Sequence, residues 1–104
     1  MKQLRIIIQP SKIDGVMSAL RKADVGGLTL SSIKGEGRAD PPLVGDTYSM
    51  EQILVVVDDN KVKEIFDTVS GIACTGKKGD GKIFVTDIVD ALDICTKKTG
   101  SDAL

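Results

Sequence analysis

The apolar residues fall into two similar halves, each with a β-branched run followed by residues spaced as on a helix. Residues 4–9 contain three consecutive isoleucines, and Pro10 ends the run. Runs of this kind favour a central strand. A helix is predicted over residues 12–22 with Ser11 as its N-cap. Its apolar face has the spacing i, i+3, i+4, i+7 and consists of Ile13, Val16, Met17 and Leu20.

The second half repeats this layout. After a turn at 24–27 and a strand at 28–33, another β-branched run occupies residues 53–57. Asn60 is the expected cap of a second helix, which should reach Ala73 or Cys74. A last strand is predicted at 82–88. The apolar positions of the second helix follow those of the first at one constant interval: Val62, Ile65, Phe66 and Val69.

Two β-α-β units in sequence are typical of an α+β domain with the ferredoxin-like split βαβ (βαββαβ) fold. We therefore expect residues 1–104 to form a single domain, with two helices on one face of a four-stranded antiparallel sheet. The strand at 28–33 should place Leu28, Leu30 and Ser32 on one face. Several positions on the other sheet face are apolar, which predicts self-association.

Two segments lie outside the repeat. Residues 34–50 contain Pro41, Pro42 and three glycines, which argue against a regular element through most of the segment. It is longer than a hairpin needs, and such loops are often functional. The C-terminal segment, residues 90–104, begins with a short apolar piece and becomes polar. Its end could fray or close over a neighbouring subunit.

The composition of the chain argues against several classes of function. The net charge is −1 and aromatic residues are few, which argues against nucleic acid as a partner. No apolar run approaches the ~20 residues that span a bilayer, so membrane insertion is not expected. The N-terminus lacks a signal-peptide layout, which predicts a cytoplasmic protein. There is no histidine, and Cys74 and Cys95 lack zinc spacing, so neither a metal site nor an enzyme is favoured. Both cysteines are expected to be partly buried.

Glycines and charged side chains are concentrated in residues 75–85, TGKKGDGKIFV. Glycines let backbone N–H groups converge, and lysines beside them make an anion or phosphate cradle. Gly76, Gly81 and Lys82 fit the P-loop pattern, but Ile83 replaces the magnesium-binding hydroxyl, and the loop leads from helix to strand. A P-loop nucleoside triphosphatase is therefore rejected. The alternative to a phosphate cradle is a glycine-rich turn with solvated lysines.

These residues identify a resemblance to the PII signal-transduction proteins over nearly the whole chain. Residues 75–85 resemble the family's B-loop (here 75–82) and the strand after it. The GLTL segment at 27–30 is similar to the family's GMTV, and KGEGR at 34–38 to the opening of its T-loop (here about 35–50). Residues 56–59, VVDD, resemble the turn before the second helix.

The resemblance implies a homotrimer that binds adenine nucleotides in clefts between subunits and signals through the T-loop to a transporter or enzyme. Gly79, Asp80, Gly81 and Lys82 would bind phosphate and ribose. Gly27, Leu28 and Thr29 would contact the base. Gly37 and Arg38 form the T-loop base, and Ile7 and Val55 are wall residues. The nucleotide is a ligand, and no cofactor is implied.

The chain also departs from the family. Ala39 stands where the family has a glutamine that helps bind magnesium and 2-oxoglutarate, and the 2-oxoglutarate lysine falls near Ser49 or Met50. Cys95 and Thr99 replace two phosphate-binding arginines. The T-loop is short and lacks the tyrosine modified in many members, because Tyr48 aligns better with the second tyrosine of the loop. Lys97 and Lys98 could compensate for the arginines, without their bidentate geometry.

These losses favour ADP or AMP over ATP, and inorganic carbon over nitrogen as the regulatory context. Bicarbonate near Arg38 is the second ligand that short-loop relatives suggest. Two alternatives stay open: a nitrogen-regulatory PII protein that binds ATP and 2-oxoglutarate, and a scaffold trimer with a decayed nucleotide site. A slow ATP hydrolase using Lys82 and Asp80 is the weakest reading.

Overall fold

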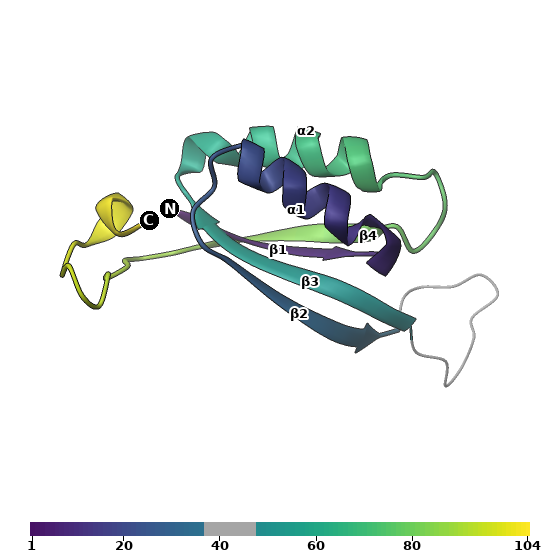
Figure 1. The fold of residues 1–104 in the computed structure, drawn as a ribbon, viewed down its shortest axis with the longest axis horizontal. Helices are drawn as coiled ribbons and strands as arrows, with labels where there is room; N and C mark the ends of the chain where they lie inside the picture. The colour runs from purple at the N-terminus through teal and green to yellow at the C-terminus, as the bar shows by residue number, and fades with distance from the viewer. Residues whose placement is uncertain (37–47) are drawn as a thin grey trace.

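A computed structural model describes residues 1–36 and 48–104 (Figure 1). Within these ranges, two helices and four strands follow one another in the order β-α-β-β-α-β. A short 3-10 turn precedes each helix, and a further one ends the chain. The elements are β1 (Lys2–Ile8), α1 (Ile13–Lys22), β2 (Leu28–Gly35), β3 (Tyr48–Val57), α2 (Val62–Ala73) and β4 (Gly81–Asp87).

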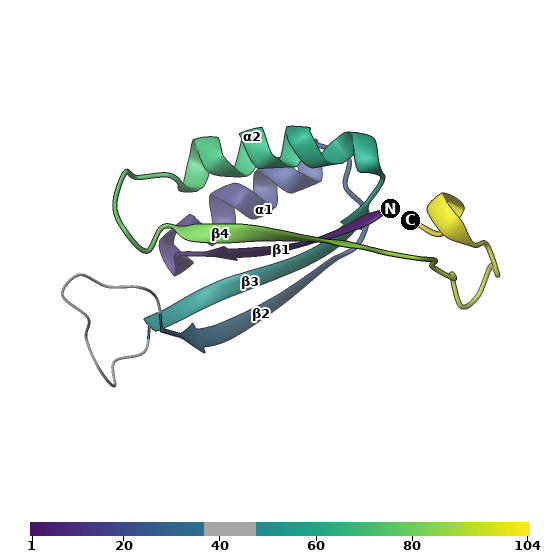
Figure 2. The same ribbon diagram turned by 180° about the vertical axis from the view of Figure 1, so that it is seen from behind.

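The four strands form one sheet in the order β2-β3-β1-β4, and every neighbouring pair is antiparallel. Both helices lie on the same face of this sheet (Figures 1 and 2). Because β1 and β3 are central, their alternate side chains point into the layer between sheet and helices. This is the ferredoxin-like arrangement that the repeated β-α-β pattern predicted.

The core is the layer between the sheet and the two helices. The strongly apolar stripe of each helix, spaced as the sequence indicated, supplies one side of it. Of the eight stripe positions, Phe66 is the one that stays exposed, at the margin of α2. The buried apolar residues are Leu4, Ile6, Ile8, Val16, Leu20, Ile53, Val55, Val57, Ile65, Val69 and Ala73.

Both helices begin differently from the sequence prediction. Each is preceded by a 3-10 turn, at Pro10–Lys12 and Asp59–Lys61, and the N-cap residues are Lys12 and Lys61. Ser11 and Asn60 lie inside these turns, and no side-chain cap bond forms, so their assignment as N-caps was wrong. The backbone closes each turn instead: the Lys12 amide donates to the Gln9 carbonyl at 2.9 Å.

The sheet extends further toward the T-loop than predicted. β2 continues to Gly35 and β3 starts at Tyr48, five residues before the apolar run. Polar pairs hold this extension, since the Ser32 hydroxyl donates to the Glu51 carboxylate at 3.0 Å. Such pairs carry no apolar alternation, which is why the pattern missed them. The rest of the predicted T-loop, residues 37–47, lies outside the described residues.

The cysteines also correct an expectation. Cys74 and Cys95 are both exposed, although small apolar character predicted partial burial. Cys74 follows the last residue of α2, and Cys95 lies in the C-terminal segment. Neither position is under the layer that covers the core, so neither can be buried within one chain.

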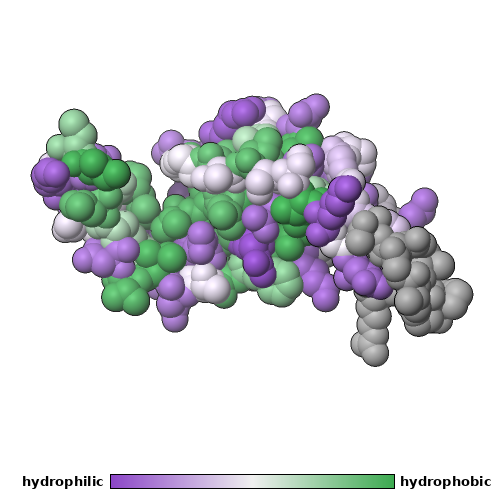
Figure 3. Space-filling model, turned by 90° about the horizontal axis from the view of Figure 1, so that it is seen from below, coloured by the Kyte–Doolittle hydropathy of each residue, from purple (hydrophilic) through white to green (hydrophobic). Residues whose placement is uncertain are grey.

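The face of the sheet opposite the helices has no covering element in the described parts of the chain. Alternate strand residues make up this surface, which we call the open face. Phe84 is 43% exposed there, and the Arg5 guanidinium lies 5.1 Å from the centre of its ring. Figure 3, viewed from the side away from the helices, shows apolar side chains among the polar ones. The apolar members of the open face are Ile7, Ile33, Met50, Leu54, Val56 and Phe84.

The C-terminal segment projects from one end of the sheet (Figure 1). Leu92 pairs with Thr99 in a short hairpin, and the Asp93 carboxylate accepts from the amides of Thr96 and Cys95. These donors, the Thr96 amide first, lower the pKa of Asp93. The Ser101 hydroxyl donates to Asp58 at 2.6 Å and ties the last turn to the body.

No helix in the described ranges is both long and apolar enough to cross a membrane.

The core predicts how two leucine truncations differ. Leu4 is fully buried on central β1, whereas Leu30 is 48% exposed on the edge strand β2. Leu4→Ala should lower the free energy of unfolding by about 2–5 kcal/mol, and Leu30→Ala by less than ~1 kcal/mol. Urea titration at one fixed protein concentration measures both. Equal losses of unfolding free energy in the two variants would mean that Leu4 is no more part of the core than Leu30 is.

Candidate functional site

The loop between α2 and β4 is organised by one carboxylate. The Thr75 hydroxyl and amide donate to Asp80 at 2.5 and 2.7 Å, and the Gly76 amide donates at 3.1 Å. Both carboxylate oxygens of Asp80 therefore accept hydrogen bonds from the loop itself. The contact of Asp80 with phosphate or ribose that the resemblance implies stays a prediction.

The same contacts set the charge of the loop. Hydrogen bonds from Thr75, its hydroxyl first, hold the pKa of Asp80 below its ordinary value of 3.8. Because this pKa is lowered by folding, the contribution to stability is present above pH 3.8 and is lost as the pH falls below that value. At neutral pH the Asp80 carboxylate is therefore ionised and its contribution to stability is retained.

Two glycines shape the cradle. Gly79 has φ +88°, and its carbonyl accepts from the Gln9 side-chain amide at 2.6 Å. Gly81 has φ +127°, and a Cβ atom there would lie 1.9 Å from the Ile7 carbonyl oxygen. Only glycine allows this approach.

Strand pairing adds Ile7, because it lies opposite Lys82 on the open face. Lys82 is exposed and has no ion pair with any described residue. The structure thus brings together five of the predicted site residues. We call this group the phosphate half-site, after the ligand predicted for it from the sequence: Ile7, Gly79, Asp80, Gly81 and Lys82.

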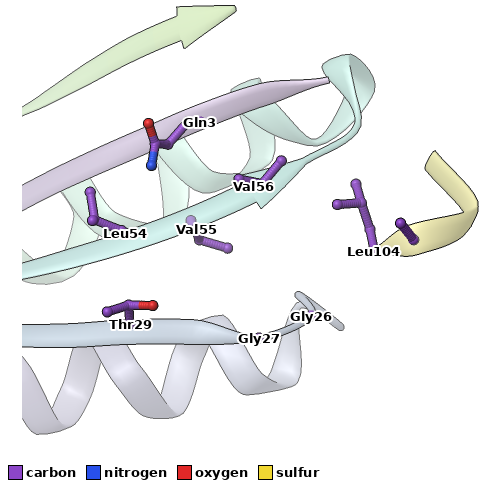
Figure 4. A pocket seen from close by; sticks show the side chains of 9 residues that line it. Gln3, Gly26, Gly27, Thr29, Leu54, Val55, Val56 and Leu104 are labelled. Carbon is purple, nitrogen blue, oxygen red and sulfur yellow. The ribbon is translucent and has the colours of Figure 1, made fainter. Parts of the chain in front are cut away.

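A second group lies at the opposite end of the sheet, where a hollow of about 250 Å³ opens beside the C-terminal turn (Figure 4). Gly27 and Thr29 line it, and Val55 borders it while its side chain is almost fully buried in the core. Leu28 points the other way and packs against the core. We call the residues that line this hollow the base half-site, because the sequence predicted base contacts for Gly27 and Thr29. They are Gln3, Gly26, Gly27, Thr29, Leu54, Val55, Val56, Ala103 and Leu104.

Within a single chain the two half-sites lie far apart. Val55 pairs with Leu4, whereas Gly81 pairs with Ile8, and these positions on β1 are about 13 Å apart along the strand. Thr29 and Gly81 also lie on the two opposite edge strands, about 14 Å apart across the sheet. The predicted site residues therefore form two clusters rather than one pocket. Gly37 and Arg38 lie outside the described residues.

Comparison with known proteins agrees with this architecture. The profile of the family described as nitrogen regulatory protein P-II matches residues 1–98. Nitrogen regulatory P-II proteins of Rhodobacter capsulatus, Mesorhizobium japonicum and Nostoc punctiforme are 38%, 37% and 35% identical to the chain, with full coverage of both sequences. The chain belongs to the P-II family. It is accordingly a PII-like regulatory signal protein.

This PII chain has fewer residues than the alignments with its relatives have positions. Each of those alignments runs over 112 positions and the chain has 104 residues, so each places at least eight gaps in this chain. A shortened T-loop, as expected from the sequence, stays a prediction.

Several residues of the base half-site were not predicted from the sequence. Gln3, Leu54 and Val56 line the hollow because alternate residues of β1 and β3 face away from the helices. The period-two pattern of these strands carries that signal once their pairing is known. Leu104 depends on the fold of the C-terminal segment, for which the sequence offers no periodicity.

The close approach at Gly81 generates a prediction for this PII protein. Gly81→Ala should destabilise the chain by about 1–3 kcal/mol, because φ +127° and the Ile7 carbonyl both oppose a side chain. Gly71→Ala is the matched control: it lies in α2 with nothing within 4 Å of the added methyl, and should stabilise by about 0.5–1 kcal/mol. Urea denaturation distinguishes them. A harmless Gly81→Ala would mean that β1 and β4 approach less closely.

Proposed function

We propose that this PII-like protein senses adenine nucleotides, ADP or AMP in preference to ATP, in clefts between subunits, and that the T-loop passes the signal to a transporter or enzyme. The observation that carries the proposal is the separation of the two half-sites. A nucleotide whose base occupied the hollow at Gly27 could not reach the cradle at Gly81 of the same chain. A neighbouring copy must supply the cradle.

The open face supports assembly into a homotrimer. It presents six apolar side chains to solvent on one side of the sheet, in a chain whose helices cover only the other side. A cyclic arrangement puts the phosphate half-site of one subunit against the base half-site of the next, because such interfaces are heterologous. Each interface then holds one complete site.

The two half-sites fit the two ends of a nucleotide. The hollow offers Leu54 and Val56 as apolar contacts for the flat base, with polar groups on Gln3 and Thr29. The loop at residues 75–82, which the Asp80 carboxylate organises by accepting from the Thr75 and Gly76 amides, offers the exposed ammonium of Lys82 to phosphate. This division of apolar and basic groups is why we favour a nucleotide over a simple anion.

The C-terminal segment supports the preference for fewer phosphates. It emerges at the end of the sheet that holds the base half-site, so it would border the same cleft. Cys95 and Thr99 contribute no positive charge there. Bicarbonate near Arg38, an inorganic-carbon context and a cytoplasmic location are parts of the proposal that rest on the sequence, and no catalytic role is proposed.

The first prediction concerns assembly. Static light scattering should give about three times the chain mass of 11.0 kDa. Phe84→Asp places a charge on the open face and should yield monomers. Phe66→Asp is the matched control, because Phe66 is similarly exposed but lies on α2, and it should stay trimeric. A monomeric parent protein would contradict the assembly.

The second prediction concerns ligand choice. Calorimetry should show ADP or AMP binding at least as tightly as ATP, with no gain from magnesium and 2-oxoglutarate. Lys82→Ala should weaken all three nucleotides by about tenfold or more, because a charge-assisted phosphate contact is worth about 1.5–3 kcal/mol. Cys95→Arg should improve ATP selectively.

The outcomes separate the competing functions. Preference for magnesium-ATP, strengthened by 2-oxoglutarate, would identify an ordinary nitrogen sensor. A trimer that binds no adenine nucleotide would identify a scaffold. Bicarbonate added to the ADP complex should change the heat of binding, and an unchanged heat would remove the inorganic-carbon part of the proposal.

A further inference from the structure

The strands carry only positive charge on the open face. Among the described strand residues that point to this side, the charged ones are Arg5 and Lys82. The acidic residues of the strands, Glu51 and Asp87, are in register with Ile8 and Lys2 and lie on the helix side. Lys82 is at one end of the sheet, in the phosphate half-site. Arg5 is the middle residue of β1, a central strand, so it occupies the centre of the open face.

Arg5 is an exposed cation among apolar neighbours. It pairs with Leu54 on β3 and with Phe84 on β4, so an apolar side chain flanks it on either side. Its guanidinium lies over the Phe84 ring and has no ion pair with any described residue. A cation held by the face of a ring gives none of its N–H donors to an acceptor oxygen. These donors therefore stay available to an anion.

The trimer under "Proposed function", on which this inference rests, brings three copies of Arg5 together. Strands lie about 4.8 Å apart, so each four-stranded sheet forms a side about 19 Å wide, and the centre of each side lies about 5–6 Å from the threefold axis. Arg5, at that centre, is within reach of the axis. Three guanidinium groups would then meet between apolar surfaces, and the described strand residues of the open faces supply no carboxylate to neutralise them. Buried charges without partners are costly, so this arrangement needs an anion.

We propose that the three Arg5 side chains of a trimer bind one small oxyanion on the threefold axis, of the class of inorganic phosphate or sulfate. A tetrahedral oxyanion has a threefold axis of its own, so it can offer an equivalent oxygen to each subunit. The planar fork of a guanidinium matches the oxygens of such an ion. A ligand that binds the trimer and not the separate chains stabilises assembly by mass action. The site would thus make trimer stability depend on the concentration of phosphate.

Stoichiometry distinguishes this axial site from the phosphate half-sites, which number one per chain. Sodium phosphate is titrated calorimetrically into the whole protein in chloride buffer, with Lys82→Ala present to weaken the half-sites. We expect one phosphate per three chains with Kd of about 10–500 μM, and competition by sulfate. Arg5→Gln should weaken binding at least tenfold. Arg21→Gln is the matched control, because Arg21 is also exposed without a described ion pair but lies on α1, and it should bind as the parent does.

Thermal unfolding gives a second readout. Saturating phosphate should raise the midpoint of the parent trimer by several degrees and leave that of Arg5→Leu unchanged. Without phosphate, Arg5→Leu should be at least as stable as the parent, because it removes three unpaired charges. If the Arg5→Leu trimer instead dissociates more readily in phosphate-free buffer, a carboxylate of a neighbouring copy pairs with Arg5, and the proposal is overturned.

The remaining outcomes separate this site from the proposed function. A trimer without an Arg5-dependent site at one phosphate per three chains would overturn the axial site alone, and its nucleotide titrations would be unaffected. A monomeric parent protein in light scattering would overturn the axial site together with the assembly.

Discussion

The pairing of β1 with β3 on one side and β4 on the other is the constraint on which the rest of the structure depends. The same strand places Leu4, Ile6 and Ile8 in the core and Ile7 on the open face. Its register with β4 requires Gly81 to pass over the Ile7 carbonyl, which anchors the cradle loop at one end of the sheet. Its register with β3 defines the hollow at the other end.

This constraint explains why the predicted binding residues form two separate clusters within one chain. The loop after α2 and the turn before β2 enter the sheet at opposite ends and on opposite edges. No local rearrangement of one chain brings them together while the strands stay paired. The two helices, by covering one sheet face, leave the other available for the copies that would complete each site. A nucleotide bound across such an interface would report on assembly and ligand together, which is a physical basis for a sensor.

The sequence predicted the parts of this structure that follow from periodicity. The stripes on α1 and α2, the isoleucine run of β1 and the β-α-β repeat led to the fold. The family motif pointed to the loop at Gly79–Lys82, and phosphate binding there stays a prediction. Other features depend on interactions that leave no periodic trace. The polar pair Ser32–Glu51 lengthens the hairpin, and backbone turns begin both helices in place of Ser11 and Asn60. Leu54, Val56 and Leu104 become a lining only when strand pairing and the C-terminal turn converge.

A mixing experiment tests most directly whether each nucleotide site is built from two subunits. Lys82→Ala damages the phosphate half-site alone. Gly27→Phe fills the base half-site alone, since nothing lies within 4 Å of a Cβ atom there. Each variant by itself should bind little ADP. After the two are denatured together in equal amounts and refolded, random assembly should restore about one site in four, because that fraction of heterologous interfaces combines two intact halves. If the mixed trimers bind no more ADP than either variant alone, the site is contained within one chain and the division of labour between subunits is wrong.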